Sequence, residues 1–144
     1  MKIKTRKFGE IEIDESKALV MPEGLPGFPG FERFILLEDP KTAPLRWFQS
    51  LEEPNLALVV TDPFFFKPDY EIDLNGFIAS RGWKEIKPED LAVYVVINIS
   101  QESADNKITA NLVGPIIINS KNNEAIQVIV SDSTYSHQHP VVES

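Results

Sequence analysis

The sequence predicts an all-β fold, a single domain over residues 1–144 built as a partly closed β-barrel or sandwich with one or two short helices. Three observations lead to this prediction. Runs of β-branched and aromatic residues, about four to nine long, recur along the chain; Pro, Gly and Asn turns separate them; and helical patterns are scarce. The hydrophobic share of 42% and charged share of 25% are ordinary for a globular domain of 144 residues.

The first element is expected to be a hairpin around Gly9, because Ile11 and Ile13 face one side while the acids between them face the other. The Pro- and Gly-rich stretch 22–31 also carries Leu25, Phe28 and Phe31, so we expect an ordered loop that packs on the body. The expected strands are 3–8, 10–13, 18–21, 34–38, 45–50, 56–61, 70–74, 92–100, 108–112, 116–118 and 125–130.

The stretch 45–70 organises the chain, with two strands joined by turn residues at 52–55. Pro63 and Pro68 bracket three phenylalanines and remove two backbone donors, so this segment is not expected to be a central strand. In an extended chain Phe64, Phe65 and Phe66 cannot all enter one core. At least one is expected at a rim, either as a binding surface or as part of a second core layer, and both interpretations stay open.

Helical signals are confined to two places. Residues 75–84 are compatible with a short helix led by Asn75 and ended near Gly82, and 88–91 with one turn that starts at Pro88. The β-branched run 92–100 is expected to be a strand buried on both faces. Residues 131–144 are expected to form a mobile tail.

Composition limits the environment and the partners. The chain has no cysteine, no apolar segment long enough to span a membrane and no apolar run after its basic N-terminus, which indicates a cytoplasmic location without membrane attachment. A net charge of −8 disfavours direct nucleic-acid binding and favours a basic protein partner, although such charge also simply maintains solubility. The basic residues of the first strand are interpreted as a solvated face.

The sequence contains no recognisable catalytic constellation. His137 and His139 form a His-x-His pair near the end of the chain, but no third ligand is evident, so no metal site is expected. No nucleophile elbow or phosphate loop is present, and adjacent acids such as Glu89 and Asp90 diverge in extended structure. We therefore expect a binding module without catalytic residues, metal or cofactor, and not an enzyme.

Several motifs taken together resemble the FliW flagellar assembly factor family over nearly the whole chain. They are Glu23-Gly24-Leu25-Pro26-Gly27-Phe28 with Phe34; Trp47-Phe48-Gln49-Ser50-Leu51; Val59-Val60-Thr61-Asp62-Pro63-Phe64-Phe65 continuing to Pro68-Asp69-Tyr70-Glu71; Thr109-Ala110-Asn111-Leu112 leading into Pro115-Ile116-Ile117-Ile118-Asn119; and Tyr135 with His139-Pro140. Each motif is weak alone, whereas five in this order and at this length are specific.

The resemblance implies a cytoplasmic, non-enzymatic, β-barrel-like protein that binds flagellin and, alternatively, the RNA-binding regulator CsrA. It implies that CsrA is antagonised non-competitively, away from its RNA site, until flagellin captures the assembly factor and CsrA again represses flagellin translation. We expect an aromatic residue to anchor the partner and acids to steer it. The expected contact residues are Asp62, Phe65, Phe66, Asp69, Tyr70 and Glu71.

Two other functions compete with this one. An acidic β module that binds a small ligand, unrelated to motility, would also display exposed aromatics, and a deep pocket would favour it. A hydrolase would require His137 or His139 beside a carboxylate in a cleft.

Overall fold

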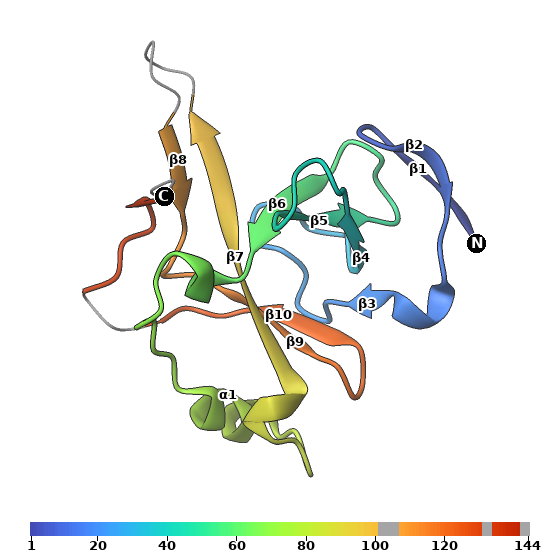
Figure 1. The fold of residues 1–144 in the computed structure, drawn as a ribbon. Coiled ribbons are helices and arrows are strands. Elements are labelled where there is room, and N and C mark those ends of the chain that lie inside the picture. Colours follow the sequence, from blue (N-terminus) through green and yellow to red (C-terminus); the bar gives the residue numbers. More distant parts are fainter. Residues whose placement is uncertain (101–106, 131–133, 142–144) are drawn as a thin grey trace.

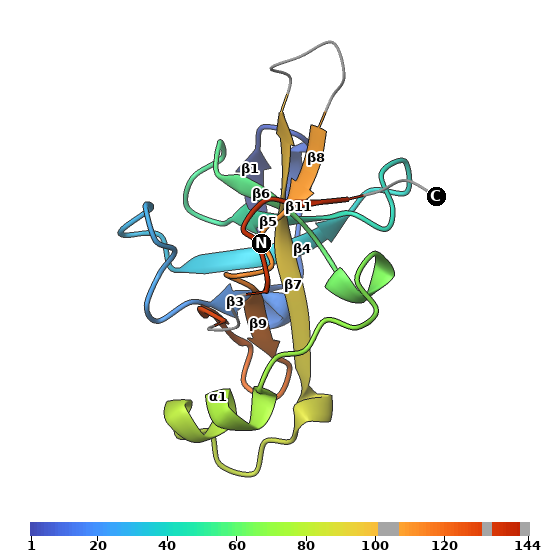
Figure 2. The ribbon, with the colours of Figure 1, turned by 90° about the vertical axis from the view of Figure 1, so that its left-hand side faces the viewer.

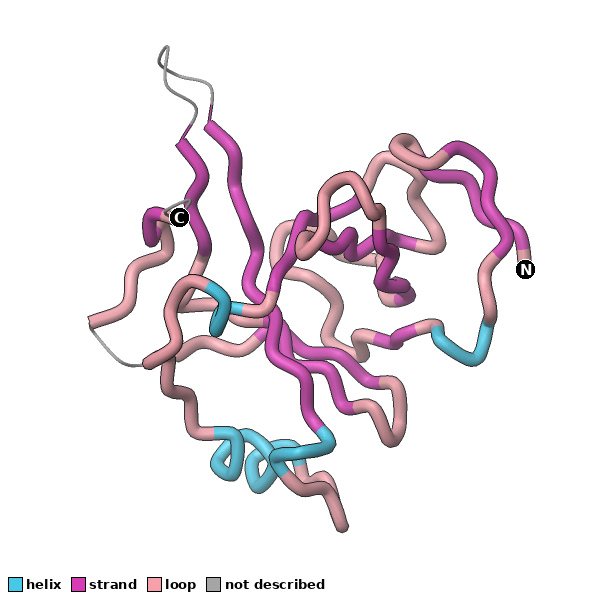
Figure 3. Tube along the Cα trace, in the orientation of Figure 1, coloured by secondary structure: helices cyan, strands magenta, loops and turns pink. Residues whose placement is uncertain are grey.

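The computed structural model describes residues 1–100, 107–130 and 134–141. Within them, the fold is mostly β with one α-helix, as the sequence predicts (Figures 1 and 3). The elements are β1 (Lys2–Thr5), β2 (Gly9–Glu12), the 3-10 helix η1 (Glu15–Lys17), β3 (Leu19–Val20), β4 (Arg33–Glu38), β5 (Arg46–Ser50), β6 (Ala57–Thr61), the 3-10 helix η2 (Pro63–Phe65), α1 (Leu74–Arg81), the 3-10 helix η3 (Pro88–Asp90), β7 (Leu91–Ser100), β8 (Lys107–Ala110), β9 (Ile116–Asn119), β10 (Glu124–Gln127) and β11 (His139–Pro140).

The main sheet closes into a ring. Its strands follow the order β7, β6, β5, β4, β3, β10 and β9, and β9 pairs back onto β7. β7 is the long strand of the fold because different parts of it serve different neighbours: Leu91–Tyr94 face β9, Val95 and Val96 face β6, and Ile97–Ser100 face β8. Figure 2 shows β7 running from the α1 end to the opposite end, where β8 accompanies it. The expected partly closed barrel or sandwich is thus realised as a closed ring with an extension.

The interior of the ring holds the main core. Its buried side chains come from six strands of the ring and from the loops beside them and are Leu19, Met21, Leu25, Phe34, Phe48, Leu56, Val60, Ile116, Ile118 and Ala125. Phe34 and Phe48 stack with their ring centroids 4.6 Å apart and their planes 7° from parallel. This aromatic pair lies on adjacent strands, so it joins β4 to β5 through side chains as well as through the backbone ladder.

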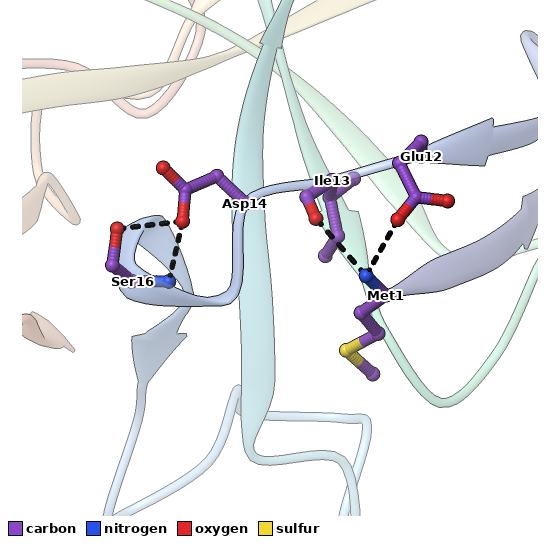
Figure 4. Close-up of polar contacts among 5 residues, drawn as sticks. All are labelled: Met1, Glu12, Ile13, Asp14 and Ser16. Carbon is purple, nitrogen blue, oxygen red and sulfur yellow. Dashed lines mark hydrogen bonds and ion pairs between the residues drawn. The ribbon is translucent and has the colours of Figure 1, made fainter.

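The β1–β2 hairpin covers the outer side of β4, where Ile3 and Ile13 pack on Ile35. Figure 4 shows how the hairpin is fastened: the amino group of Met1 donates to Glu12 Oε1 at 2.8 Å and to the Ile13 carbonyl at 3.3 Å. Contact with Glu12 raises the pKa of this amino group. The predicted hairpin is present, but its turn is formed by residues 6–8 and not by Gly9, so the expected strand 3–8 ends at Thr5. Gly9 begins β2 with a φ of 70°, which explains why glycine stands there.

Helix α1 begins one residue before the expected Asn75. Asp73, just before the helix, accepts a hydrogen bond from the Gly76 amide at 2.9 Å and so acts as the N-cap. Gly82 ends the helix in the left-handed region with φ 69°, as expected. Because α1 already starts at Leu74, the expected strand over 70–74 is wrong. Its alternation is nevertheless real, since Ile72 packs inward while Glu71 is exposed.

The expectation that 92–100 is buried on both faces holds only for the middle of β7. Val95 and Ile97 are buried on one face, and Val96 on the other face is half-buried against the interior core, whereas Asn98 and Ile99 are exposed. The reason is geometric: the C-terminal part of β7 extends beyond the ring beside β8. An apolar run alone cannot tell where a strand leaves the core.

The Pro-Gly loop 22–31 is ordered as expected. Gly24, Gly27 and Gly30 all have positive φ, Leu25 is 4% exposed, and Phe31 packs against the interior core. Phe28 is the exception because it is 41% exposed.

Candidate functional site: the 62–71 loop

The proline-framed segment after β6 is held by a capped 3-10 turn. Asp62 Oδ1 accepts a hydrogen bond from the Phe64 amide at 2.8 Å, and Pro63 occupies the first position of η2, where no amide donor is needed. We name residues 62–71 the 62–71 loop. Its phenylalanines therefore radiate from a 3-10 turn and not from the extended chain assumed in the sequence argument.

The three phenylalanines go to different places. Phe65 is 69% exposed and Phe64 is 44% exposed, whereas Phe66 is half-buried against the cluster outside β6 and β7. Phe66 also stacks on His139 with ring centroids 5.9 Å apart. The expectation that at least one of them lies at a rim is confirmed, and Phe65 is the most exposed.

Tyr70 supports this surface from beneath. Its side chain is 3% exposed, and its hydroxyl donates to the Leu112 carbonyl at 2.6 Å. Tyr135 packs against it at 4.8 Å between ring centroids and accepts a hydrogen bond from the Glu71 amide at 2.7 Å. The structure thus buries Tyr70, which the sequence argument placed among the contact residues, because its ring lies under the loop and not on it.

The charged side chains of the 62–71 loop lie on its solvent side. Asp69 and Glu71 are exposed, and Asp62 is half-buried. Lys67 pairs with Asp69 at 3.0 Å, and its hydrogen bond lowers the pKa of Asp69. The loop therefore presents an exposed aromatic side chain among acidic side chains.

A groove of about 420 Å³ adjoins Phe65. Arg46 crosses it, donating to the Tyr94 hydroxyl at 2.6 Å and pairing with Glu38 at 3.1 Å. The lining residues are Glu38, Asp39, Pro40, Ala43, Pro44, Leu45, Arg46, Asp62, Phe65 and Tyr94. Of the residues expected at the site, Asp62 and Phe65 line this groove.

The sequence argument missed the groove residues contributed by other strands. Arg46 and Tyr94 are 48 positions apart and meet only because both β5 and β7 flank β6. Tyr135 was also missed as a support for the 62–71 loop. The part of the expected tail that the structure describes, 134–141, contacts the body through β11, which pairs with β8.

Burial of Tyr70 gives a testable pH dependence. Burial disfavours the phenolate and raises the pKa of Tyr70 above its usual value near 10. The folded state therefore holds its proton more tightly than the unfolded state, so this contribution is complete below pH 10 and is lost as the pH rises above it. We expect the free energy of unfolding to fall at alkaline pH by at most about 1.4 kcal/mol per pH unit from this group.

Tyr70→Phe isolates the effect. At neutral pH the variant should lose about 1–3 kcal/mol, because the buried Leu112 carbonyl loses the hydrogen bond that it accepts from the Tyr70 hydroxyl. Above pH 10 its stability should fall less steeply than that of the parent, as measured by urea unfolding at a series of pH values. If the free energies of unfolding of the two proteins fell equally steeply above pH 10, the raised pKa of Tyr70 would be contradicted.

Metal and membrane sites find no support in the part of the chain described. There, no group of three or more His, Asp or Glu side chains is placed to hold a metal ion. His137 is exposed, whereas His139 is half-buried in β11. None of the described helices has the length and apolar character needed to cross a bilayer.

Comparison with known proteins decides the family. The family model described as FliW protein matches residues 2–141. The chain belongs to the FliW family. A FliW relative in Treponema denticola, named flagellar assembly factor FliW, is 39% identical over 142 residues, which cover 99% of this chain and 94% of the relative. A FliW relative of the same name in Alkaliphilus metalliredigens is 35% identical over 144 residues, covering 99% and 87%.

The fold agrees with a solved FliW structure. A crystal structure described as that of the flagellar assembly factor FliW superposes with a TM-score of 0.84 at 32% sequence identity, covering 100% of this chain and 99% of the other. The resemblance noted from motifs in the sequence is therefore confirmed at the level of the FliW family and of its fold.

Proposed function

We propose that this chain is a cytoplasmic flagellar assembly factor without enzymatic activity, which binds flagellin and, alternatively, the RNA-binding regulator CsrA. CsrA would be antagonised non-competitively, away from its RNA site, so that repression of flagellin translation is relieved. Membership of the FliW family and the names of its relatives support the flagellar role.

The observation that carries the proposal is the exposed Phe65 among acidic side chains. Phe65 is 69% exposed on a turn whose backbone is fixed by Asp62 and Pro63, so little backbone entropy remains to be lost when a partner covers it. The contact surface that we propose consists of Asp62, Phe65, Phe66, Asp69 and Glu71, with Tyr70 beneath it.

The acidic surface suits partners that carry basic patches. The chain has 22 acidic and 14 basic side chains, and the exposed Asp69 and Glu71 add to the field close to Phe65. Complementary charge raises the rate of encounter and weakens with added salt. The apolar anchor contributes binding energy that salt does not screen.

The test is calorimetry with purified CsrA and with purified flagellin at low and high salt, followed by displacement of CsrA by flagellin. Glu71→Lys should weaken CsrA binding and reduce its dependence on salt, because a steering charge is reversed. Glu89→Lys is the matched control, since Glu89 is also exposed but lies on η3. Absence of binding to both proteins would overturn the proposed function, and equal effects of the two variants would overturn the site.

A further inference from the structure

A second hollow, of about 440 Å³, lies between the turn that follows β1 and the outer side of β5 and β6. Its lining residues are Arg6, Lys7, Trp47, Gln49, Pro54, Asn55 and Ala57. Trp47 and Gln49 are two positions apart on β5, so they project from the same face of the sheet. None of these residues belongs to the 62–71 loop.

Gln49 leaves a hydrogen-bond acceptor unused in this hollow. The residue is 1% exposed, and its Nε2 donates to the carbonyls of Ser50 at 3.0 Å and Leu56 at 3.2 Å. These carbonyls fix the orientation of the amide, because the flipped amide would turn its oxygen towards them. Gln49 Oε1 is buried and has no donor among the described residues. A buried acceptor without a partner costs free energy, which a ligand donor recovers.

Trp47 supplies the complementary donor. Its ring meets Phe8 edge to face at 6.2 Å, and Lys7 Nζ lies 4.4 Å from its ring centroid. Trp47 Nε1 is buried and finds no acceptor within the described parts of the chain. One face of β5 thus offers an unpaired donor and an unpaired acceptor, which is the pattern that a peptide group satisfies with its carbonyl and its amide.

The mouth of the hollow is basic in an otherwise acidic protein. Arg6 and Lys7 line it, and none of its described lining residues is acidic. Earlier in the hairpin, Lys2 and Lys4 stand opposite Glu12 and Glu10 in the strand register, so their charges are compensated locally. Lys7 Nζ forms an ion pair with Asp39 Oδ2 at 3.6 Å, whereas Arg6 forms no ion pair with the described residues. The positive charge of Arg6, which no described acid neutralises, therefore favours a ligand that carries a carboxylate.

We propose that this hollow binds an acidic peptide segment of a partner protein. A peptide carbonyl accepts from Trp47 Nε1, the peptide amide donates to Gln49 Oε1, and an adjacent Asp or Glu carboxylate pairs with Arg6 and Lys7. The segment reaches the two buried atoms by displacing exposed side chains at the mouth, among them Lys7, whose ammonium lies over the indole. Its acidic chemistry is opposite to that of the basic partner surface suited to the 62–71 loop, and its lining lies outside that loop, so this site goes beyond the proposed function.

The chain carries an internal control for an NMR test. It has two tryptophans, and Trp83 Nε1 already donates to Glu124 at 3.0 Å. In the full-length ¹⁵N-labelled protein, millimolar acetyl-Gly-Asp-Gly-amide should shift the indole signal of Trp47 saturably and leave that of Trp83 in place. The isosteric acetyl-Gly-Asn-Gly-amide should bind about two- to fivefold more weakly, since it lacks the charge.

Two variants separate the parts of the site. Arg6→Gln should bring the affinities for the Asp and Asn peptides to within a factor of about two of each other, while leaving the fold intact, because the recorded bond of Arg6 is made by its backbone amide. Trp47→Phe keeps an aromatic ring beside Phe8 and should weaken binding about five- to tenfold, followed through the side-chain amide signals of Gln49.

Three results would overturn the proposal. They are an unchanged Trp47 signal at millimolar peptide, equal shifts of Trp47 and Trp83, and the same Trp47 shift with acetate alone, which would show that no peptide group is recognised. A saturable Trp47 shift that needs the peptide group and is strengthened about two- to fivefold by the carboxylate supports it. Loss of CsrA or flagellin binding does not bear on this result, because the NMR probe contains neither protein.

Discussion

Phe48→Ala is expected to lower the free energy of unfolding by about 3–5 kcal/mol. Phe48 is 1% exposed inside the ring and stacks on Phe34 at 4.6 Å, so alanine would remove a large apolar side chain and leave a cavity between β4 and β5. The strands around Phe48 cannot move into that cavity without losing their pairing around the closed ring. Urea unfolding followed by circular dichroism measures the loss.

Phe65→Ala is the matched control for that measurement. It makes the same substitution at a side chain that is 69% exposed, so its effect on stability should lie within about 0.5 kcal/mol of zero. Similar losses in both variants would contradict the assignment of Phe48 to the interior core.

Phe65→Ala is expected to weaken binding of CsrA or flagellin at least tenfold, and about thirtyfold if Phe65 contributes the 2 kcal/mol typical of an aromatic hot spot. The side chain projects from a capped turn beside the groove crossed by Arg46, where a partner can enclose it. Because the same variant retains its stability, a loss of affinity reports on contact and not on unfolding. Calorimetry at moderate salt measures the change.

Phe28→Ala controls for general surface hydrophobicity. Phe28 is 41% exposed but lies on the loop 22–31, so its replacement should leave both affinities unchanged. Unchanged affinity in Phe65→Ala, or an equal loss in the two variants, would remove Phe65 from the contact surface.

Local patterns were sufficient to predict most elements of this fold. The alternation around Ile11 and Ile13, the hairpin next to Gly9 and the β-branched run of β7 follow from short-range chemistry, and the structure bears them out. The closure of the ring was not predictable, because it depends on the pairing of β9 with β7. The sequence of an apolar strand does not indicate which strand it pairs with. The exposure of Ile99 was not predictable either, because it depends on where β7 extends beyond the ring.

The candidate site could be predicted only where one segment supplies it. The two prolines located the exposed phenylalanine correctly, although the reason was a 3-10 turn and not an alternating strand. Tyr70 was expected among the contact residues but is buried, and its hydroxyl bonds to the Leu112 carbonyl, 42 positions away, which no local pattern indicates. Likewise, no local signal couples Arg46 to Tyr94.

The way in which the ring closes has a consequence for the order of events on the ribosome. The β9–β10 hairpin, residues 116–127, fills the gap between β7 and β3, and β3 pairs with β10 in parallel through Val20 and Glu124. Until that hairpin has emerged, the chain from β3 to β7 is an open sheet with two bare edges and no closed interior. Such edges are sites of unwanted pairing with other chains. The nascent protein therefore exposes these two edges from the emergence of β7 until the β9–β10 hairpin follows, and pairing of that short hairpin with β7 and β3 ends the exposure.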